Sequence, residues 1–176
     1  MAKKEVNTDL WVHELLKEAG IRENFDAQGS NVKEINDALK TASKKGTGNS
    51  GFPEYVGIVK DFLIIIEDKP GLSKHINYTD DDLIADDVKS NTDYAVNGAV
   101  FYAKHLADKV SYKKIIAVGI SGNEKKHRIT PIFVNERGEY FELADIETLI
   151  SEMQTGAAEF YVYGIRAYRE IHPRDM

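Results

Sequence analysis

The sequence predicts an α/β fold, a central mixed β-sheet flanked by helices, on three observations. Residues 55–59 and 62–66 are rich in β-branched and aromatic side chains and are separated by two polar residues, which is typical of a hairpin. The second run is apolar on both faces, so we expect it in the centre of the sheet. Residues 94–109 carry apolar side chains at helical spacing. Residues 112–120 form a further apolar run, and a strand entered after such a crossover helix pairs in parallel.

Two helices and a loop are expected upstream of the hairpin. Asp9 stands before an apolar pattern of helical spacing that stops at Gly20, which predicts a helix capped by Asp9. The same spacing predicts a second helix that begins at Ser30 or Asn31. Residues 44–51 contain three glycines and interrupt the periodicity, so they are expected to form a loop.

A second hairpin and a short helix are expected downstream. Residues 129–134 and 140–143 have the composition of strands and turn near Gly138. Asp145 is of the residue type that caps helices, and it predicts a helix that runs to Ile150. The acidic residues 79–93 are expected to form a loop or the start of a helix, and the pattern of residues 160–176 fits no single type of element.

Composition limits the class of protein. The chain has 176 residues, of which 42% are apolar, and this is enough to build one ordinary domain without disulfide or metal staples. It has no cysteine, which excludes a zinc ribbon, a thiol nucleophile and a disulfide framework. No apolar run approaches the roughly 20 residues that span a bilayer. We therefore expect a soluble protein of the cytoplasm with no membrane partner.

The formal net charge of −6 is unevenly distributed. Residues 79–93 contain six aspartates and one lysine, a local charge of −5. Residues 104–128 contain seven lysines and arginines against two acids, a local charge of +5. Such segregation can support polyanion binding on one face of an acidic protein. The alternative is that both segments are ordinary solvated surface.

The most informative constellation joins the two strands of the first hairpin. Glu67 follows the apolar strand, and Lys69 points to the same side if the strand continues. Glu54 opens the neighbouring strand, and thirteen residues of travel up and down the hairpin return the chain beside Glu67. Carboxylate oxygens are the ligands that Mg²⁺ prefers, and an ammonium can orient a water and stabilise negative charge. The backbone carbonyl of Asp68 is a candidate further ligand.

In order and spacing, Pro53-Glu54 and Glu67-Asp68-Lys69 resemble the motif of the PD-(D/E)xK nuclease superfamily. The chain resembles more closely the N-terminal nuclease domain of restriction-modification enzymes. These are the type I restriction R subunit and the type II enzymes in which a nuclease is fused to an adenine-N6 methyltransferase. The segments that carry this likeness, mainly to the fused type II group, are residues 42–48, 51–55, 60–69 and 95–105. The resemblance covers residues 31–134.

The resemblance implies a restriction-endonuclease-like core and a role for each matching residue. Glu54 and Glu67 would be metal carboxylates, and Lys69 would be the catalytic lysine. Glu34 is the best match for an acid that the preceding helix often contributes to the metal site.

Two auxiliary positions lie on the helix after the lysine strand. Many relatives of the type I group carry Gln-x-x-x-Tyr there. Tyr102 matches the tyrosine, Gly98 occupies the glutamine position, and Asn97 is a candidate substitute.

The family's expected cofactor is Mg²⁺, for which Mn²⁺ can substitute, and its expected partners are double-stranded DNA and methyltransferase, specificity or motor domains or subunits. The expected domains are an N-terminal helical segment (1–29), a nuclease-like domain (30–152) and an extension toward a missing domain (153–176). Candidate phosphate contacts are lysines of the glycine-rich loop and the basic segment: Lys44, Lys45, Lys113, Lys114 and Lys125.

Two other functions remain open at this point. The nuclease-like fold could be catalytically silent and serve as a DNA-binding or assembly module beside a methyltransferase or motor. Alternatively, the chain could be a generic α/β protein that binds a small ligand or a protein, which a separation of more than about 8 Å between Glu54 and Glu67 would support. His75, six residues after Lys69, is a further candidate for a place near the site or for a phosphate contact.

Overall fold

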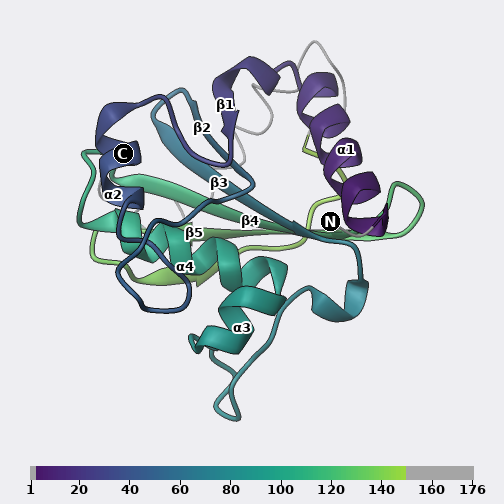
Figure 1. Cartoon of the computed structure of the whole chain (residues 1–176). Coiled ribbons are helices and arrows are strands. Elements are labelled where there is room, and N and C mark those ends of the chain that lie inside the picture. Colours follow the sequence, from purple (N-terminus) through teal and green to yellow (C-terminus); the bar gives the residue numbers. More distant parts are fainter. Residues whose placement is uncertain (1–2, 150–176) are drawn as a thin grey trace.

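The computed structural model describes residues 3–149, which form a mixed six-stranded sheet with helices on both faces (Figure 1). The strands lie in chain order, and within the described residues β3 and β4 are the parallel pair while the other neighbours are antiparallel. The strands are β1 (Phe25–Ala27), β2 (Tyr55–Val59), β3 (Phe62–Lys69), β4 (Lys114–Gly122), β5 (His127–Val134) and β6 (Tyr140–Glu142). This is the α/β class expected from the sequence and is consistent with a restriction-endonuclease-like core.

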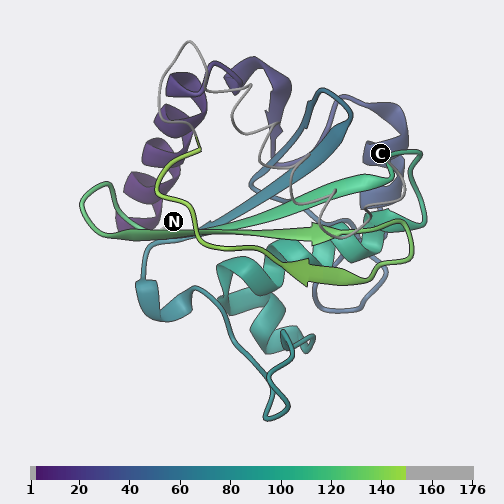
Figure 2. The same cartoon turned by 180° about the vertical axis from the view of Figure 1, so that it is seen from behind.

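The helices divide between the two faces of the sheet, as the two opposite views show (Figures 1 and 2). On one face, α1 packs its apolar side over β3 and β4, and on the other face α2 and α4 form a second core with the same strands. The helices are α1 (Lys3–Glu18), α2 (Lys33–Leu39), α3 (Val88–Asp93) and α4 (Ala95–Ala107), with short 3-10 turns η1 (Arg22–Asn24) and η2 (Leu72–Lys74). In the described part of the chain, no helix is both long and apolar enough to cross a membrane.

Strand β3 lies in the middle of the sheet and feeds both cores. Successive side chains of a strand point to opposite faces. Ile64 and Ile66 accordingly pack toward α1, while Leu63 and Ile65 pack toward α4. Both faces are buried, which explains the uninterrupted apolar sequence. The same alternation continues to the end of the strand and decides which polar side chain emerges on which face.

The first hairpin and the crossover are confirmed. Strands β2 and β3 pair antiparallel, with Val59 opposite Phe62, and the turn between them has Lys60 at a φ of 58°. Strands β3 and β4 pair in parallel after α4, as the crossover predicted. The hairpin that turns near Gly138 is also present.

The expected start of the first helix is wrong. Asp9 does not cap α1, because the helix begins at Lys3 and continues through Asp9 to Glu18. The first turn is polar, so the apolar spacing that begins at Leu10 marks where the helix meets the sheet rather than where it starts.

The expected helix after Asp145 is absent from residues 145–149, and its expected end at Ile150 lies outside the described residues. The carboxylate of Asp145 accepts hydrogen bonds from Arg128 and Thr130, so it is not available as a helix cap. Ile146 instead forms a β-bridge with Ile129. The expected extension at residues 153–176 also lies outside the described residues.

Candidate metal centre

The predicted pair of glutamates meets at one edge of the sheet. Glu54 directly precedes β2, and the register that places Tyr55 opposite Ile66 brings it beside the last residues of β3. The backbone N–H of Glu54 donates to Oε2 of Glu67 at 2.8 Å. The hairpin therefore brings these two residues together, although they are thirteen positions apart.

Glu67 points toward the α4 face, where its carboxylate is buried. Its residue is 4% exposed, and Oε1 lies 2.5 Å from Nζ of Lys44. Strand β3 continues to Lys69, which is half-buried and lies two positions after Glu67 in the same strand, so both side chains emerge on this face. The pairing partner of Glu67 in β4 is Gly119, whose missing side chain lets the start of α4 approach at Val96.

Asp68 emerges on the opposite face and meets α1. Ligand oxygens of Asp9, Glu54 and Asp68 all lie within 4.8 Å of one another. Two buried oxygens of this cluster, Oδ1 of Asp9 and Oδ2 of Asp68, have no hydrogen-bond partner. Glu54 belongs to both arrangements, since its N–H bonds Glu67 and its carboxylate joins this second cluster.

The crowding of three carboxylates perturbs their protonation. Burial, the Glu67 charge and the Asp9 charge raise the pKa of Glu54 to about 7, and Lys44 and Lys69 oppose the shift. Burial, followed by the charges of Glu54 and Asp9, raises the pKa of Asp68 to about 9. Buried oxygens without partners and carboxylates that repel one another are what a bound divalent cation would satisfy. The donor set therefore fits a hard metal ion.

The sequence pattern predicts Asp9 as a helix cap and not as a ligand. Val12 and Leu16, three and seven positions later, are fully buried on the face that contacts the sheet. Asp9 shares that face, so the signal in the sequence was a carboxylate on the apolar side of an amphipathic helix.

The structure does not bring the helix acid Glu34 to the cluster. Oε1 of Glu34 accepts hydrogen bonds from the backbone N–H and the hydroxyl of Ser111, at 3.1 and 2.6 Å. Ser111 precedes β4, which begins opposite Phe62, whereas Glu67 lies five residues farther along β3. Glu34 thus lies toward the other end of the sheet.

The two auxiliary residues on α4 occupy different surroundings. Asn97 is 1% exposed. Its side-chain amide donates hydrogen bonds to the carbonyls of Asn77 and Ala85 and accepts one from the N–H of Asn77, so it holds the two ends of residues 77–85 together. Tyr102 lies by the Lys44 and Glu67 pair, and its hydroxyl accepts a hydrogen bond from Phe52 N–H at 3.2 Å. Asn97 is therefore engaged in the fold, while Tyr102 borders the site.

The candidate phosphate contacts do not share one location. Lys114 bonds Asp61 at 2.8 Å and Lys113 lies 4.0 Å from Glu136, both at the start of β4. The turn after β4 holds an exposed Lys125, at the far end of a nine-residue strand. Exposed Lys45 belongs to the glycine-rich loop. The basic segment is thus divided between the two ends of the sheet, and Lys125 is at the end where Glu67 lies.

His75 is buried in a hydrogen-bonded network with Ser121 of β4 and Thr130 of β5. Thr130 donates its hydroxyl hydrogen to Asp145, so Nε2 of His75 donates to Thr130 and Nδ1 accepts from the Ser121 hydroxyl at 2.7 Å. Burial and the Arg128 charge lower the His75 pKa to about 4, which keeps the imidazole neutral. With both ring nitrogens engaged and 1% exposure, this histidine ties the loop after β3 to β4 and β5.

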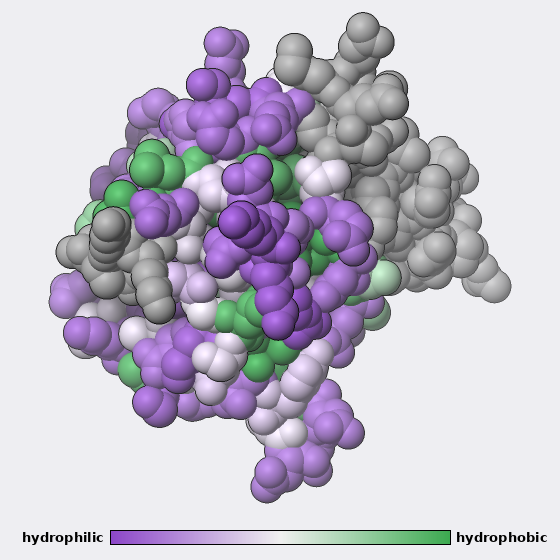
Figure 3. All heavy atoms as spheres, turned by 90° about the vertical axis from the view of Figure 1, so that its right-hand side faces the viewer, coloured by the Kyte–Doolittle hydropathy of each residue, from purple (hydrophilic) through white to green (hydrophobic). Residues whose placement is uncertain are grey.

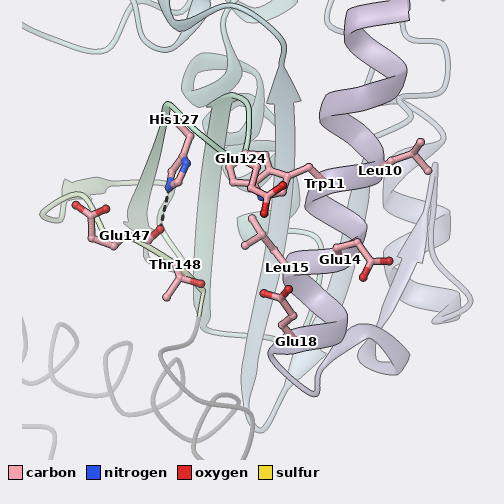
Figure 4. A pocket seen from close by; sticks show the side chains of 9 residues that line it. All are labelled: Leu10, Trp11, Glu14, Leu15, Glu18, Glu124, His127, Glu147 and Thr148. Carbon is pink, nitrogen blue, oxygen red and sulfur yellow. Dashed lines mark hydrogen bonds between the residues drawn. The ribbon is translucent and has the colours of Figure 1, made fainter.

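A separate pocket of about 510 Å³ lies between α1 and the β4–β5 turn (Figure 4). Its apolar lining residues are Leu10, Trp11 and Leu15 of α1, and Nε2 of His127 lies 2.9 Å from the carbonyl oxygen of Glu147. Four carboxylates line it: Glu14, Glu18, Glu124 and Glu147. The lining of this pocket does not include Asp9, Glu54 or Asp68.

The side of the molecule on the right of Figure 1 is largely hydrophilic with small apolar areas between (Figure 3).

The described residues thus define a class, an α/β protein with a candidate metal centre at the edge of its central sheet. The chain is 36% identical to the type II restriction enzyme and methyltransferase RM.BcgI of Heyndrickxia coagulans over 163 residues, which are 92% of this chain and 25% of that protein. It therefore spans about a quarter of the length of the curated relative it matches. No protein-family model matches the chain. No solved structure matches it either.

Proposed function

We propose that this chain is a Mg²⁺-dependent endonuclease domain that cleaves DNA phosphodiester bonds within a restriction-modification enzyme. The observation that carries the proposal is the convergence of Asp9, Glu54 and Asp68 within 4.8 Å, with two buried oxygens that lack partners. Similarity to a protein named as a restriction enzyme and methyltransferase supports the DNA substrate. The proposed domain is residues 30–152, to which the structure adds a contribution from α1 through Asp9.

The proposed roles follow from the two faces of β3. Glu54 is the central ligand of the ion, with the carboxylates of Asp9 and Asp68 as further ligands on the α1 face and that of Glu67 on the α4 face. When bound, a divalent ion supplies a Lewis acid for a phosphate oxygen and lowers the pKa of a coordinated water. Lys69 orients the attacking water and stabilises the negative charge that develops on the phosphate. Lys45 and Lys125, both exposed at or near this end of the molecule, contact the DNA backbone.

The test compares plasmid cleavage by the wild type, Lys69→Ala and a matched control, Lys74→Ala, with Mg²⁺ or Mn²⁺ and with the methyltransferase and specificity partners present. We expect cleavage by the wild type and the control, and a loss of at least about 100-fold in Lys69→Ala. Equal cleavage by the wild type and Lys69→Ala would refute the assignment of the lysine.

A second candidate is a catalytically silent nuclease-like module that binds DNA or supports assembly. One observation favours it: Glu67 is already paired with the ammonium of Lys44, which can replace a metal ion as its counter-charge. Calorimetric titration with Mn²⁺ separates the two candidates. No metal binding to the wild type would favour the silent module, whereas binding that weakens in Glu67→Gln and Asp68→Asn favours the nuclease.

A further inference from the structure

Lys44 begins the glycine-rich loop, yet its side chain points inward. The side chain is 17% exposed, and that of its partner Glu67 is 6% exposed. The ammonium lies 2.5 Å from Oε1 of Glu67 and 5.0 Å from the ring centroid of Tyr102. An ion pair in such surroundings is screened by water much less than a surface pair. This contact differs from the free phosphate contact that the sequence predicted for Lys44.

The space for Lys44 exists because residue 98 is a glycine. A Cβ at Gly98 would lie 3.0 Å from Nζ and 3.3 Å from Cε of Lys44. It would also lie 2.9 Å from the carbonyl oxygen of Asn91, which cannot easily move. Even the smallest side chain at this position of α4 would therefore press on the lysine.

The loop that presents Lys44 is held at both ends. The N–H of Ser43 donates to the carbonyl of Asn49 at 2.9 Å, and the N–H of Gly51 donates to the carbonyl of Leu39 at 2.8 Å. Gly51 also packs against Tyr102, because a Cβ there would lie 2.7 Å from its ring. The backbone hydrogen bonds of the loop thus fix the position of the Lys44 Cα, and the packing against α4 fixes the position of its ammonium.

We propose that Lys44 is a positioning residue for Glu67, an inference that rests on the proposed nuclease function. Lys44 engages Oε1, and the N–H of Glu54 engages Oε2, so the two contacts set the plane of the carboxylate. An ionised carboxylate has about four lone-pair sites, so both oxygens can still accept another partner. Lys44 holds the Glu67 carboxylate aimed at the site, and it acts on the reaction through Glu67 rather than through DNA.

The first test separates positioning from phosphate contact by steady-state kinetics. In Lys44→Met we expect kcat to fall about 100-fold while the KM for DNA stays within about threefold, because misplacement of a reacting group costs rate. The matched control is Lys45→Met, the exposed neighbour, which should raise KM and lower its salt dependence. A raised KM with intact kcat in Lys44→Met would overturn the inference and restore the phosphate contact.

The second test uses the absence of cysteine in this chain. In Lys44→Cys the introduced thiol is the only one in this chain, and 2-bromoethylamine, applied before the partners are added, converts it to an aminoethyl thioether of nearly the length of lysine. We expect this treatment to recover at least about a tenth of the wild-type kcat, whereas iodoacetamide, which adds a neutral group, should recover none. A folded, aminoethylated protein without recovered activity would overturn the inference, and melting curves establish that it is folded.

A third measurement needs no nuclease activity. In ¹H–¹⁵N spectra of lysine ammonium groups, buried Lys44 should give a signal protected from solvent exchange that disappears in Glu67→Gln. A signal without protection, or one indifferent to Glu67→Gln, would overturn the inference. If protection is found but wild type and variants all fail to cleave DNA, the proposed function fails and the contact between the two residues stands.

Discussion

The backbone N–H of Glu54 donates to Oε2 of Glu67 at 2.8 Å, while the side chain of Glu54 lies with Asp68 and Asp9 on the other face of the sheet. One residue at the start of β2 thus links the polar groups of both faces of β3. This placement follows from the hairpin register, since Tyr55 pairs with Ile66.

Substitution of Asp68 by asparagine should weaken metal binding without destabilising the metal-free protein. Asp68→Asn removes a carboxylate that burial and neighbouring charges already disfavour, so the metal-free melting temperature should stay equal or rise. We expect Mn²⁺ affinity, measured by calorimetry, to fall at least about tenfold. Asp81→Asn, which changes an exposed acid of the loop, is the control. Unchanged affinity in Asp68→Asn would remove this residue from the site.

Metal binding should strengthen as pH rises. Glu54 has a folded pKa of about 7 against an ordinary value of 4.5, so between these values the folded state binds protons that the unfolded state has released. Its contribution to metal-free stability therefore declines as pH rises through this window. Metal ions require the deprotonated carboxylate. The increase in melting temperature that Mn²⁺ causes should be larger at pH 8 than at pH 5, and an increase independent of pH would contradict the proposed ligands.

His75 should make the protein less stable in acid. Its pKa is about 4 in the folded state and 6.5 ordinarily, so the unfolded state binds more protons between these values. Stability is complete above pH 6.5 and declines as pH falls toward 4, by up to about 3 kcal/mol. Urea unfolding across this range should show the decline in wild type and in His13→Gln, and a flatter curve in His75→Gln. An equally steep decline of stability with falling pH in His75→Gln would mean that groups other than His75 cause the acid sensitivity.

Gly119 should tolerate no side chain. A Cβ there would lie 2.4 Å from Cγ2 and 2.6 Å from the backbone nitrogen of Val96, so Gly119→Ala must displace α4 from the strand that carries Glu67. We expect a loss of about 1–3 kcal/mol in the free energy of unfolding. In Gly71→Ala the nearest neighbour of the added Cβ would be Ser73 Oγ at 3.7 Å, and stability should be unchanged or slightly raised. Equal effects of the two substitutions would mean that α4 does not press on β4.

The sequence predicted the sheet better than its surroundings. Period-two and period-3.6 patterns located the first hairpin, the crossover helix and the parallel pair, because those residues are buried and burial is what such patterns report. The three-residue strand β1 was missed, since so short a segment has no measurable period. Asp145 was misassigned because its acceptor oxygens bond Arg128 and Thr130, which are distant in sequence.

The candidate site was predictable only where it depends on the register of the first hairpin. The meeting of Glu54 with Glu67 follows from counting residues around a hairpin. The approach of Asp9 to Asp68 depends on how α1 packs over the sheet, and the inward turn of Lys44 depends on the space above Gly98. Both are tertiary contacts without a local pattern.

A crystal soaked in Mn²⁺ would show whether Glu54 binds a divalent ion at the edge of the sheet. Anomalous scattering locates the ion independently of how the side chains are built. We predict a peak about 2.0–2.6 Å from a carboxylate oxygen of Glu54, with further ligands among Asp9, Glu67 and Asp68. A fully soaked crystal without a peak at Glu54, or with manganese only at other carboxylates, would mean that Glu54 is not a metal ligand.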